Sequence, residues 1–374
     1  MDAAVQGGTT ARTIGIVTGG GDAPGLNAVI RAVHRAASRR GMRVVGFCEG
    51  FEGLLHPETA IILDYANTAG IIGRGGTILG TSNRGSFAVK TDLGETQSLD
   101  PAVIAGARAT LATLGVDALV CIGGDGSLTV ALELAKAGVP VVGVPKTIDN
   151  DLSATDSTFG FDSAVSMVTE ALDRLHPTAY SHRRVMVLEV MGRHAGWIAL
   201  YGGIAGGTDV ILIPEIPFEL GCVAETVRAR EEAGRHFTMV VVAEGAAPAG
   251  GGVSAKTRPQ DREARLGGIG ERVTGELERL TGKEARCVVL GHLQRGGPPT
   301  ATDRLLATAF GTTAVRLVEQ GCFGFMVALQ GSTVRMVPLA DAVRTLRRVP
   351  EDHYLLTVAR ELGISFGDAR STKR

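Results

Sequence analysis

The sequence predicts an α/β protein of two lobes, each a mainly parallel sheet flanked by helices. Short apolar, β-branched runs alternate with helix-period segments, and glycines gather at the ends of the runs. Buried parallel strands read as near-continuous apolar runs, and strand–helix–strand alternation covers both faces of a parallel sheet with helices. The chain has 374 residues, of which 44% are hydrophobic, enough to bury the cores of two domain-sized lobes.

Seven apolar runs are predicted as buried strands: Thr13–Val17, Val44–Phe47, Ala118–Ile122, Val139–Val144, Val185–Val190, Val210–Ile213 and Met239–Val242. Helices are predicted where apolar residues recur at helical spacing, over 24–39, 160–175, 219–233 and 303–319. Pro24 is expected to open the first helix, because the first turn of a helix tolerates proline. In such sheets ligands bind at the carboxyl ends of the strands, so the loops there are candidate sites.

Charge and cysteine usage exclude several classes of protein. The 38 Lys and Arg residues nearly balance the 39 Asp and Glu residues, which argues against a nucleic-acid binder. The five cysteines are scattered without a CxxC pair and indicate a reducing compartment, with no disulfide framework or zinc site. No apolar stretch reaches membrane-spanning length, and the first residues lack the pattern of a signal peptide. We therefore expect a cytoplasmic protein with no membrane partner.

Two glycine-rich loops follow predicted strands and suit phosphate binding. Thr18–Gly25 (TGGGDAPG) lets backbone N–H groups approach a phosphate next to a helix N-terminus. It matches neither GxGxxG nor a Walker A loop, and alone it is equally compatible with a tight turn. In Gly123–Ser127 (GGDGS), Asp125 offers a carboxylate to Mg²⁺ and Ser127 is placed to cap the next helix. A plain turn is the alternative for this second loop.

A short acidic turn, Pro145–Asp151 (PKTIDND), follows another predicted strand. Asp149 and Asp151 are two residues apart, so in an extended turn both carboxylates face one side. Such a pair suits a proton-abstracting base and a partner that holds a cation or orients the base, although polar turns have the same composition. Together with the two glycine-rich loops, the pair predicts phosphoryl transfer.

A second set of residues indicates a receptor for a phosphorylated sugar. Gly291–Gly297 (GHLQRGG) brings His292 and Arg295 close together beside flexible backbone. Glu244 follows a predicted strand and suits sugar hydroxyls. Three further arginines adjoin strand-like runs, namely Arg184, Arg193 and Arg286. Guanidinium forks match phosphate oxygens, but each of these arginines taken singly is more often a surface or ion-paired residue.

With these residues in view, the chain resembles the phosphofructokinase family over nearly its whole length. Eight segments carry the resemblance: Thr18–Asn27, Arg74–Gly80, Gly123–Ser127, Pro145–Asp151, Gly160–Ala164, Glu189–Gly196, Pro214–Phe218 and Gly291–Arg304. Each is unspecific alone, and the eight in this order are highly specific. The resemblance implies a 6-phosphofructokinase that transfers the γ-phosphoryl group of ATP to the 1-hydroxyl of fructose 6-phosphate. The product would be fructose 1,6-bisphosphate, made in glycolysis with Mg²⁺ as cofactor.

The resemblance also implies roles for individual residues. Asp149 would be the base that deprotonates the sugar hydroxyl, Asp151 would assist base and metal, and Asp125 would bind Mg²⁺. Thr147 would hold the sugar near the transferred phosphoryl group, and Arg193 would support the transition state. The ATP site would comprise Gly20, Arg84, Gly124, Gly126, Ser127 and Lys146, with Arg84 displaced by one position from the family's arginine. The sugar-phosphate site would comprise Thr147, Arg184, Met191, Gly192, Arg193, Glu244, Arg286, His292 and Arg295.

The same resemblance implies how the chain is organised. Residues 1–160 plus 294–344 would form the phosphoryl-donor lobe, and residues 161–293 plus 345–374 the fructose 6-phosphate lobe. Arg184 and Arg286 match residues that the family supplies from a neighbouring subunit. The expected assembly is therefore a homodimer or a homotetramer.

The phosphoryl donor has two candidates. In the family a glycine at position 126 leaves room for the α-phosphate of ATP, whereas an aspartate there accompanies pyrophosphate use. Lys146 also accompanies pyrophosphate use, so Gly126 with Lys146 is a mixed signature. Because an aspartate at 126 would exclude the nucleotide by size and charge and is absent, ATP is favoured. A pyrophosphate-dependent phosphotransferase is the alternative. A catalytically silent sugar-phosphate sensor is the lesser one, disfavoured because Asp125, Asp149 and Asp151 are all present.

Overall fold

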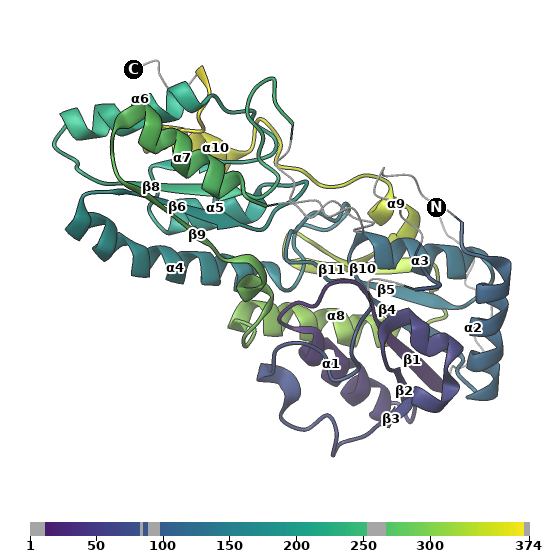
Figure 1. Ribbon diagram of the computed structural model, residues 1–374. Helices are drawn as coiled ribbons and strands as arrows, with labels where there is room; N and C mark the ends of the chain where they lie inside the picture. Colours follow the sequence, from purple (N-terminus) through teal and green to yellow (C-terminus); the bar gives the residue numbers. More distant parts are fainter. Residues whose placement is uncertain (1–11, 83–84, 89–97, 253–266, 370–374) are drawn as a thin grey trace. The chain divides into compact units, whose positions relative to one another are not determined.

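The computed structural model describes residues 12–82, 85–88, 98–252 and 267–369. The chain divides into two compact units (Figure 1). The first comprises Met1–Ile148, Leu152–Asp162 and Arg295–Leu346, and the second comprises Asp149–Asp151, Ser163–Gln294 and Arg347–Arg374. The predicted boundaries between the lobes lie after residues 160, 293 and 344. In the structure the chain passes between the units after residues 162, 294 and 346, and the 149–151 turn is additionally grouped in the second unit. Which ligand each lobe binds stays a prediction.

The first unit is built on a mainly parallel sheet. In the part of the chain that the structure describes, the strands follow the order β11-β10-β5-β4-β1-β2-β3, and only β3 and β11 pair antiparallel with their neighbours. The strands are β1 (Thr13–Thr18), β2 (Arg43–Phe47), β3 (Ile61–Leu63), β4 (Ala118–Gly123), β5 (Val141–Pro145), β10 (Phe325–Gln330) and β11 (Thr333–Pro338). The register sets Thr18 opposite Ile122 and Gly123 opposite Pro145, so β1, β4 and β5 end together at one edge.

Helices cover both faces of this sheet. They are α1 (Leu26–Ser38), α2 (Pro101–Thr113), α3 (Asp125–Lys136), α8 (Ala301–Glu319) and α9 (Leu339–Val343), with short 3₁₀ turns at Gly50–Leu55, Pro57–Thr59 and Ile71–Gly73. On one face, α1 and α8 lie side by side (Figure 1). Gly311 of α8 permits this approach, because a Cβ there would lie 2.9 Å from the carbonyl oxygen of Val29 in α1.

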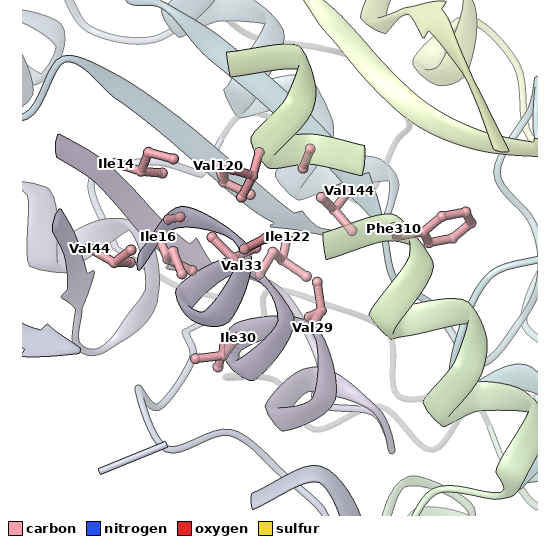
Figure 2. Packing of buried hydrophobic residues seen from close by; sticks show 14 of the residues in the cluster. Ile14, Ile16, Val29, Ile30, Val33, Val44, Val120, Ile122, Val144 and Phe310 are labelled. Atoms are coloured by element: carbon pink, nitrogen blue, oxygen red, sulfur yellow. The ribbon is translucent and has the colours of Figure 1, made fainter. Parts of the chain in front are cut away.

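The core between the sheet and these two helices is made of aliphatic side chains. Ile14, Ile16, Val120, Ile122 and Val144 of the strands form one cluster with Val29, Ile30 and Val33 of α1 and Phe310 of α8 (Figure 2). Alternate residues of the same strands, such as Leu119 and Cys121, point to the other face and pack in a second cluster. Burying each such side chain stabilises the fold by about 1.5–3 kcal/mol. The strands therefore form a rigid base for the loops at their carboxyl ends.

The second unit contains a smaller sheet in the order β7-β8-β6-β9, parallel throughout its described strands. These are β6 (Val185–Val190), β7 (Val210–Leu212), β8 (Thr238–Ala243) and β9 (Ala285–Val289). The helices are α4 (Phe161–His182), α5 (Trp197–Ala205), α6 (Leu220–Glu232), α7 (Ile269–Thr281) and α10 (Tyr354–Glu361), and Gly291–Arg295 forms a 3₁₀ turn, η4. α6 and α7 pack side by side against this sheet. None of the described helices is both long and apolar enough to cross a lipid bilayer.

The predicted two-lobe α/β class is confirmed, with two local corrections. Pro24 does not open α1, which begins at Leu26. Gly25 precedes it with φ 109°, a left-handed conformation that ends any helical continuity with Pro24. β3, β9, β10 and β11 were not among the predicted strands. β3 has only three residues, β9 and β10 include half-buried or exposed positions, and Thr333 and Arg335 of β11 are exposed and polar, so none of the four has the continuous pattern of a buried strand.

Candidate active site

Three loops meet at the carboxyl edge of the first sheet. The Thr18–Gly25 loop is joined to β4 by a hydrogen bond from Gly19 N to Ile122 O (2.9 Å). The Gly123–Ser127 loop is joined to the end of β5 by a bond from Lys146 N to Gly123 O (2.9 Å). The predicted donor-site residues Gly20, Gly124, Gly126, Ser127 and Lys146 all belong to these loops. Arg84 lies outside the described residues.

Ser127 packs the two glycine-rich loops against each other. A Cβ at Gly19 would lie 2.6 Å from Ser127 Oγ, and a Cβ at Gly123 would overlap the Cβ of Ser127. Ser127 is buried inside the first turn of α3, whose N-cap is Gly124. The expectation that Ser127 caps this helix is therefore wrong, because the helix begins two residues earlier, at Asp125.

The N-terminus of α3 presents open space next to a carboxylate. Gly126 is exposed, and a Cβ added there would meet no atom within 4 Å. Neither protein packing nor a left-handed φ requires glycine at this position. The backbone N–H groups and the dipole of a helix N-terminus favour an anion. Gly126 therefore leaves free a position that suits a phosphate group.

The residues around Asp125 fit a magnesium ion bound together with a phosphorylated ligand. Among the described residues there is no cluster of three or more His, Cys, Asp and Glu that could hold a metal alone. Mg²⁺ is usually bound by one or two carboxylates plus phosphate oxygens and water. Asp125, half-buried as the first residue of α3, can supply such a carboxylate beside the two glycine-rich loops.

Two cationic side chains hold the Thr18–Gly25 loop. Lys146 is 3% exposed, and its ammonium group donates a hydrogen bond to the carbonyl oxygen of Gly21. Arg295 donates from Nη1 to the carbonyl oxygen of Asp22 (3.1 Å). A Cβ at Gly21 would lie 2.8 Å from this Nη1 atom, so a larger residue there would shift the end of the Arg295 side chain. Arg295, predicted in the sugar-phosphate site, thus contacts the glycine-rich loop within the first unit.

The turn with the predicted base belongs to the second unit and has an unusual backbone. Asn150, between Asp149 and Asp151, is 3% exposed and has φ 52°. Asparagine tolerates this left-handed conformation better than most residues. The turn is bonded to Arg347, whose backbone N donates to Asp151 O (2.8 Å) and whose Nη1 donates to Asn150 O (3.3 Å). Thr147, just before the turn, is half-buried in the first unit.

The carboxyl edge of the second sheet gathers most of the predicted sugar-phosphate residues. Glu244 N donates to Val190 O (2.8 Å), and Gly245 N donates to Gly192 O (3.1 Å), so the loops after β6 and β8 run side by side. These loops contain Met191, Gly192, Arg193 and Glu244. Gln294 of η4 is 1% exposed, and its Oε1 accepts a bond from Met191 N (3.3 Å), which brings the η4 turn that carries His292 to the same edge.

Arg184 and Arg286 lie at the opposite edge of this sheet. Arg184 directly precedes β6, and Arg286 pairs with Met186 near the start of the same strand. Both guanidinium groups contact Glu284 Oε1, at 3.3 and 2.5 Å. Met191 follows the far end of β6, about 20 Å away at the usual rise per residue. The structure therefore does not bring this arginine pair to the loops of Met191 and Glu244.

Glu215, for which the sequence predicted no role, connects two segments of the second unit. Its carboxylate accepts hydrogen bonds from Gly196 N (3.0 Å) and Val349 N (2.9 Å). Burial raises its pKa, opposed by these two bonds. Glu215 thereby ties the loop that follows Arg193 to the chain segment that contains Arg347.

The family model described as phosphofructokinase matches residues 13–318 of the chain. The chain belongs to the phosphofructokinase family. This confirms the resemblance drawn from the eight sequence segments, and the glycine-rich loops, the acidic turn and the η4 turn all lie within the matched residues.

Relatives of this phosphofructokinase carry two kinds of name. An ATP-dependent 6-phosphofructokinase of Chloroflexus aurantiacus is 55% identical over 95% of this chain and 98% of its own length. ATP-dependent 6-phosphofructokinase 2 of Streptomyces coelicolor is 52% identical over 91% and 97%. A pyrophosphate–fructose 6-phosphate 1-phosphotransferase of Amycolatopsis methanolica is 51% identical over 91% and 97%.

A solved structure supports the fold of this phosphofructokinase. The Pichia pastoris phosphofructokinase in the T-state is 32% identical and matches with a TM-score of 0.78. The match covers 97% of this chain but 38% of the Pichia chain, so the present chain spans well under half of that protein.

Two residues that hold these loops, Arg347 and Glu215, were not predicted from the sequence. Arg347 lies in a C-terminal segment without any motif, and its contact with Asn150 spans 197 positions. Glu215 lies within Pro214–Phe218, one of the segments that resemble the family, which was the only signal available for it. Local patterns do not encode contacts of such sequence separation.

Proposed function

We propose that this phosphofructokinase transfers the γ-phosphoryl group of ATP to the 1-hydroxyl of fructose 6-phosphate. The product is fructose 1,6-bisphosphate, and the reaction belongs to glycolysis in the cytoplasm. The observation that carries the proposal is 55% identity to an ATP-dependent 6-phosphofructokinase over nearly the full length of both chains. The open position at Gly126 supports ATP as the donor.

In this mechanism the sequence-predicted residues act as follows. Asp149 takes the proton of the sugar 1-hydroxyl while the hydroxyl oxygen attacks the γ-phosphorus. The bond from this phosphorus to the β,γ-bridging oxygen breaks and ADP leaves, and Asp151 orients the base. Thr147 holds the sugar near the transferred group, and Arg193 stabilises the charge of the transition state. When bound, Mg²⁺ held by Asp125 and the donor phosphates neutralises negative charge.

The donor phosphates would be bound mainly by backbone N–H groups of the two glycine-rich loops. Gly20, Gly124, Gly126 and Ser127 belong to two loops that Ser127 packs together at the N-terminus of α3. Backbone N–H groups and the helix dipole suit polyphosphate binding there. Arg84 remains a predicted contact on the basis of sequence alone.

Pyrophosphate as the donor is the second candidate, favoured by Lys146 and by the relative from Amycolatopsis methanolica. Lys146, however, is buried and bonded to the carbonyl oxygen of Gly21. A lysine engaged in this way acts on the glycine-rich loop and leaves the space at Gly126 open. We therefore keep ATP as the proposed donor.

The sugar phosphate would be held by Met191, Gly192, Arg193, Glu244, His292 and Arg295 of one chain. Arg184 and Arg286 would contact the sugar phosphate of a neighbouring subunit in a homodimer or homotetramer. Their place at the opposite edge of the sheet from Met191 and Glu244 supports this division, because they do not reach those loops in their own chain.

The deciding assay supplies fructose 6-phosphate and Mg²⁺ with either ATP or pyrophosphate and measures fructose 1,6-bisphosphate. We expect turnover with ATP and a much lower kcat/KM with pyrophosphate. A higher kcat/KM with pyrophosphate would show that the enzyme is a pyrophosphate-dependent phosphotransferase. Absence of turnover with both donors would reject the proposal that the protein is an enzyme. The remaining alternative would be a catalytically silent sugar-phosphate sensor.

A further inference from the structure

We propose that Arg347 is a positioning residue that holds the catalytic turn 149–151 in its reactive conformation. The inference rests on the proposed role of Asp149 as the base. Arg347 touches no reacting group in this proposal. It acts through the backbone of the turn, from a place fixed by the chain's single tryptophan, Trp197.

The turn needs support from outside because its backbone conformation is uncommon. A left-handed conformation costs most non-glycine residues about 1–2 kcal/mol, and Asn150 adopts it with φ 52° in a buried position. Such backbone persists where the surroundings enforce it. Arg347 supplies two donors, its backbone N to Asp151 O (2.8 Å) and its Nη1 to Asn150 O (3.3 Å). It therefore donates hydrogen bonds to the carbonyl groups of the two residues that directly follow the base.

Arg347 is itself fixed in two ways by Trp197. The guanidinium Cζ lies 4.4 Å from the centre of the indole ring, in a cation–π contact. In return, Trp197 Nε1 donates a hydrogen bond to the carbonyl oxygen of Arg347 (3.0 Å). Trp197 is 1% exposed as the first residue of α5, so it is a rigid support. The side chain and the backbone of Arg347 are thus held by one aromatic residue.

The same support carries the loop of the other predicted catalytic side chain. Gly196 and Trp197 directly continue the loop that contains Arg193. Glu215 accepts from Gly196 N (3.0 Å) and from Val349 N (2.9 Å), two residues beyond Arg347. The turn of the base and the loop of Arg193 are therefore connected to one scaffold within the second unit. A shift of Arg347 is expected to move the base relative to Arg193.

The contacts require arginine rather than any cation. A planar guanidinium can stack on an indole while its edge donates to a carbonyl oxygen, whereas a lysine ammonium is a point charge on a flexible stem. Arg347→Lys should therefore restore only part of the function lost in Arg347→Met. The exposed Arg344 offers a matched control, because its side chain is 75% exposed and pairs only loosely with Asp341 at 4.0 Å.

The test compares steady-state kinetics of the full-length wild type with those of Arg347→Met, Arg347→Lys and Arg344→Met, using ATP, Mg²⁺ and fructose 6-phosphate. Displacing a catalytic group by about 1 Å can cost about 10²-fold in rate. We expect kcat to fall about 10²-fold in Arg347→Met and about 10-fold in Arg347→Lys, with KM for fructose 6-phosphate changed less than about 3-fold. Arg344→Met should keep the wild-type kcat.

Two further measurements do not depend on turnover. Hydrogen exchange of the backbone amides in 148–152 should accelerate in Arg347→Met, while exchange in β1 (Thr13–Thr18) should stay unchanged. Fluorescence of Trp197, the single tryptophan, should change because the cation leaves its ring. If wild type shows no turnover, the proposed function fails and exchange in 148–152 still decides whether Arg347 holds the turn.

Several results would overturn the inference. One is a kcat in folded Arg347→Met within about twofold of wild type, and another is a rise in KM alone. Unchanged exchange in 148–152 would also reject it. Should Arg347→Met fold poorly, the kinetics of Arg347→Lys are used instead. If the activity of Arg347→Lys falls only in proportion to its unfolded fraction, Arg347 has a general structural role and the inference is rejected.

Discussion

The ammonium group of Lys146, at the end of β5, donates a hydrogen bond to the carbonyl oxygen of Gly21 in the loop after β1. The Thr18–Gly25 loop is thereby fastened to a strand that is not its neighbour in the sheet, since β4 lies between β1 and β5. Lys146, which the family resemblance connects with pyrophosphate use, thus also holds the Thr18–Gly25 loop, the predicted donor loop. Its influence on the donor would be exerted through the backbone of that loop as well as through its charge.

Lys146→Met should weaken the use of both donors, and pyrophosphate use more than ATP use. The variant loses a charge-assisted hydrogen bond, a contact that contributes about 1.5–3 kcal/mol, and a cation near the phosphates. ATP would lose less affinity than pyrophosphate, because its adenosine makes further contacts that pyrophosphate lacks. The measurement is kcat/KM for each donor, with the exposed Lys136→Met as control. An unchanged ratio of the two values would show that Lys146 has no part in donor selection.

Asp149→Asn should reduce kcat by about 10²–10⁴-fold, the usual contribution of a general base. The amide preserves the shape of the side chain but does not accept the hydroxyl proton, so the urea midpoint should change little. Asp173→Asn, an exposed carboxylate on α4, is the control and should retain full activity. A kcat near that of wild type would remove Asp149 from its role as base.

Gly126→Asp should leave the fold intact and suppress ATP use. An added Cβ at 126 meets no atom within 4 Å, and an acidic residue in the first turn of a helix is favourable. The new carboxylate would occupy the space proposed for the nucleotide. Gly221→Asp is a matched control, because Gly221 is likewise the second residue of a helix, α6, with no neighbour near its Cβ.

We expect KM for ATP to rise at least about tenfold in Gly126→Asp, an effect of about 1.4 kcal/mol on binding, and not in Gly221→Asp. Thermal unfolding of both variants should match wild type. Equal ATP kinetics in the two variants would show that the α3 N-terminus does not hold the nucleotide.

A mixture of two inactive variants should recover activity if Arg286 serves a neighbouring subunit. In a hybrid of Asp149→Asn and Arg286→Ala chains, one site combines an intact Asp149 with an intact partner arginine. Refolding the two together should give activity well above that of either alone. Recovery no greater than the sum of the separate preparations would place Arg286 in its own chain's site or outside any site.

The stability of the second unit should depend on the protonation of His353, whose ring lies 5.0 Å from that of Trp197. Burial, with the nearby Arg347 charge second, lowers the pKa of His353. Between this lowered pKa and the ordinary value of about 6.5, the unfolded chain binds more protons, so stability falls as pH falls through that window.

His353→Asn should therefore lose less stability than wild type between pH 7.5 and pH 5.5 in urea unfolding. Asparagine keeps an acceptor for Leu355 N, which His353 now provides through Nδ1 (3.4 Å) as the N-cap of α10. Parallel pH curves for the two proteins would contradict a lowered pKa for the half-buried His353.

The sequence predicted the parts of this phosphofructokinase that local patterns encode. The β-branched runs from Thr13 and Val185 form β1 and β6, because a strand buried on both faces must be apolar throughout. The glycine-rich loops were recognisable because they follow such runs. The start of α1 was misplaced, because Phe159 packs against Gly25 and the left-handed φ of Gly25 depends on that tertiary context.

Contacts between residues far apart in the chain could not be predicted from local sequence patterns. The bond from Arg347 to Asn150 spans 197 positions, and nothing in the composition of the C-terminal segment indicates it. The close approach of Ser127 to Gly19 likewise depends on β1 and β4 being neighbours in the sheet. Such pairs follow from topology and register, which periodicity in one segment does not determine.

The position of Arg347 in the chain has a consequence for biosynthesis. Both sheets are complete in the nascent polypeptide once Pro338 has been translated, but the arginine that grips the 149–151 turn emerges later. A ribosome that stops between these two points would release a chain with every described strand in place and an unsupported catalytic turn. Completion of the described sheets and support of the 149–151 turn would therefore be separate events in time.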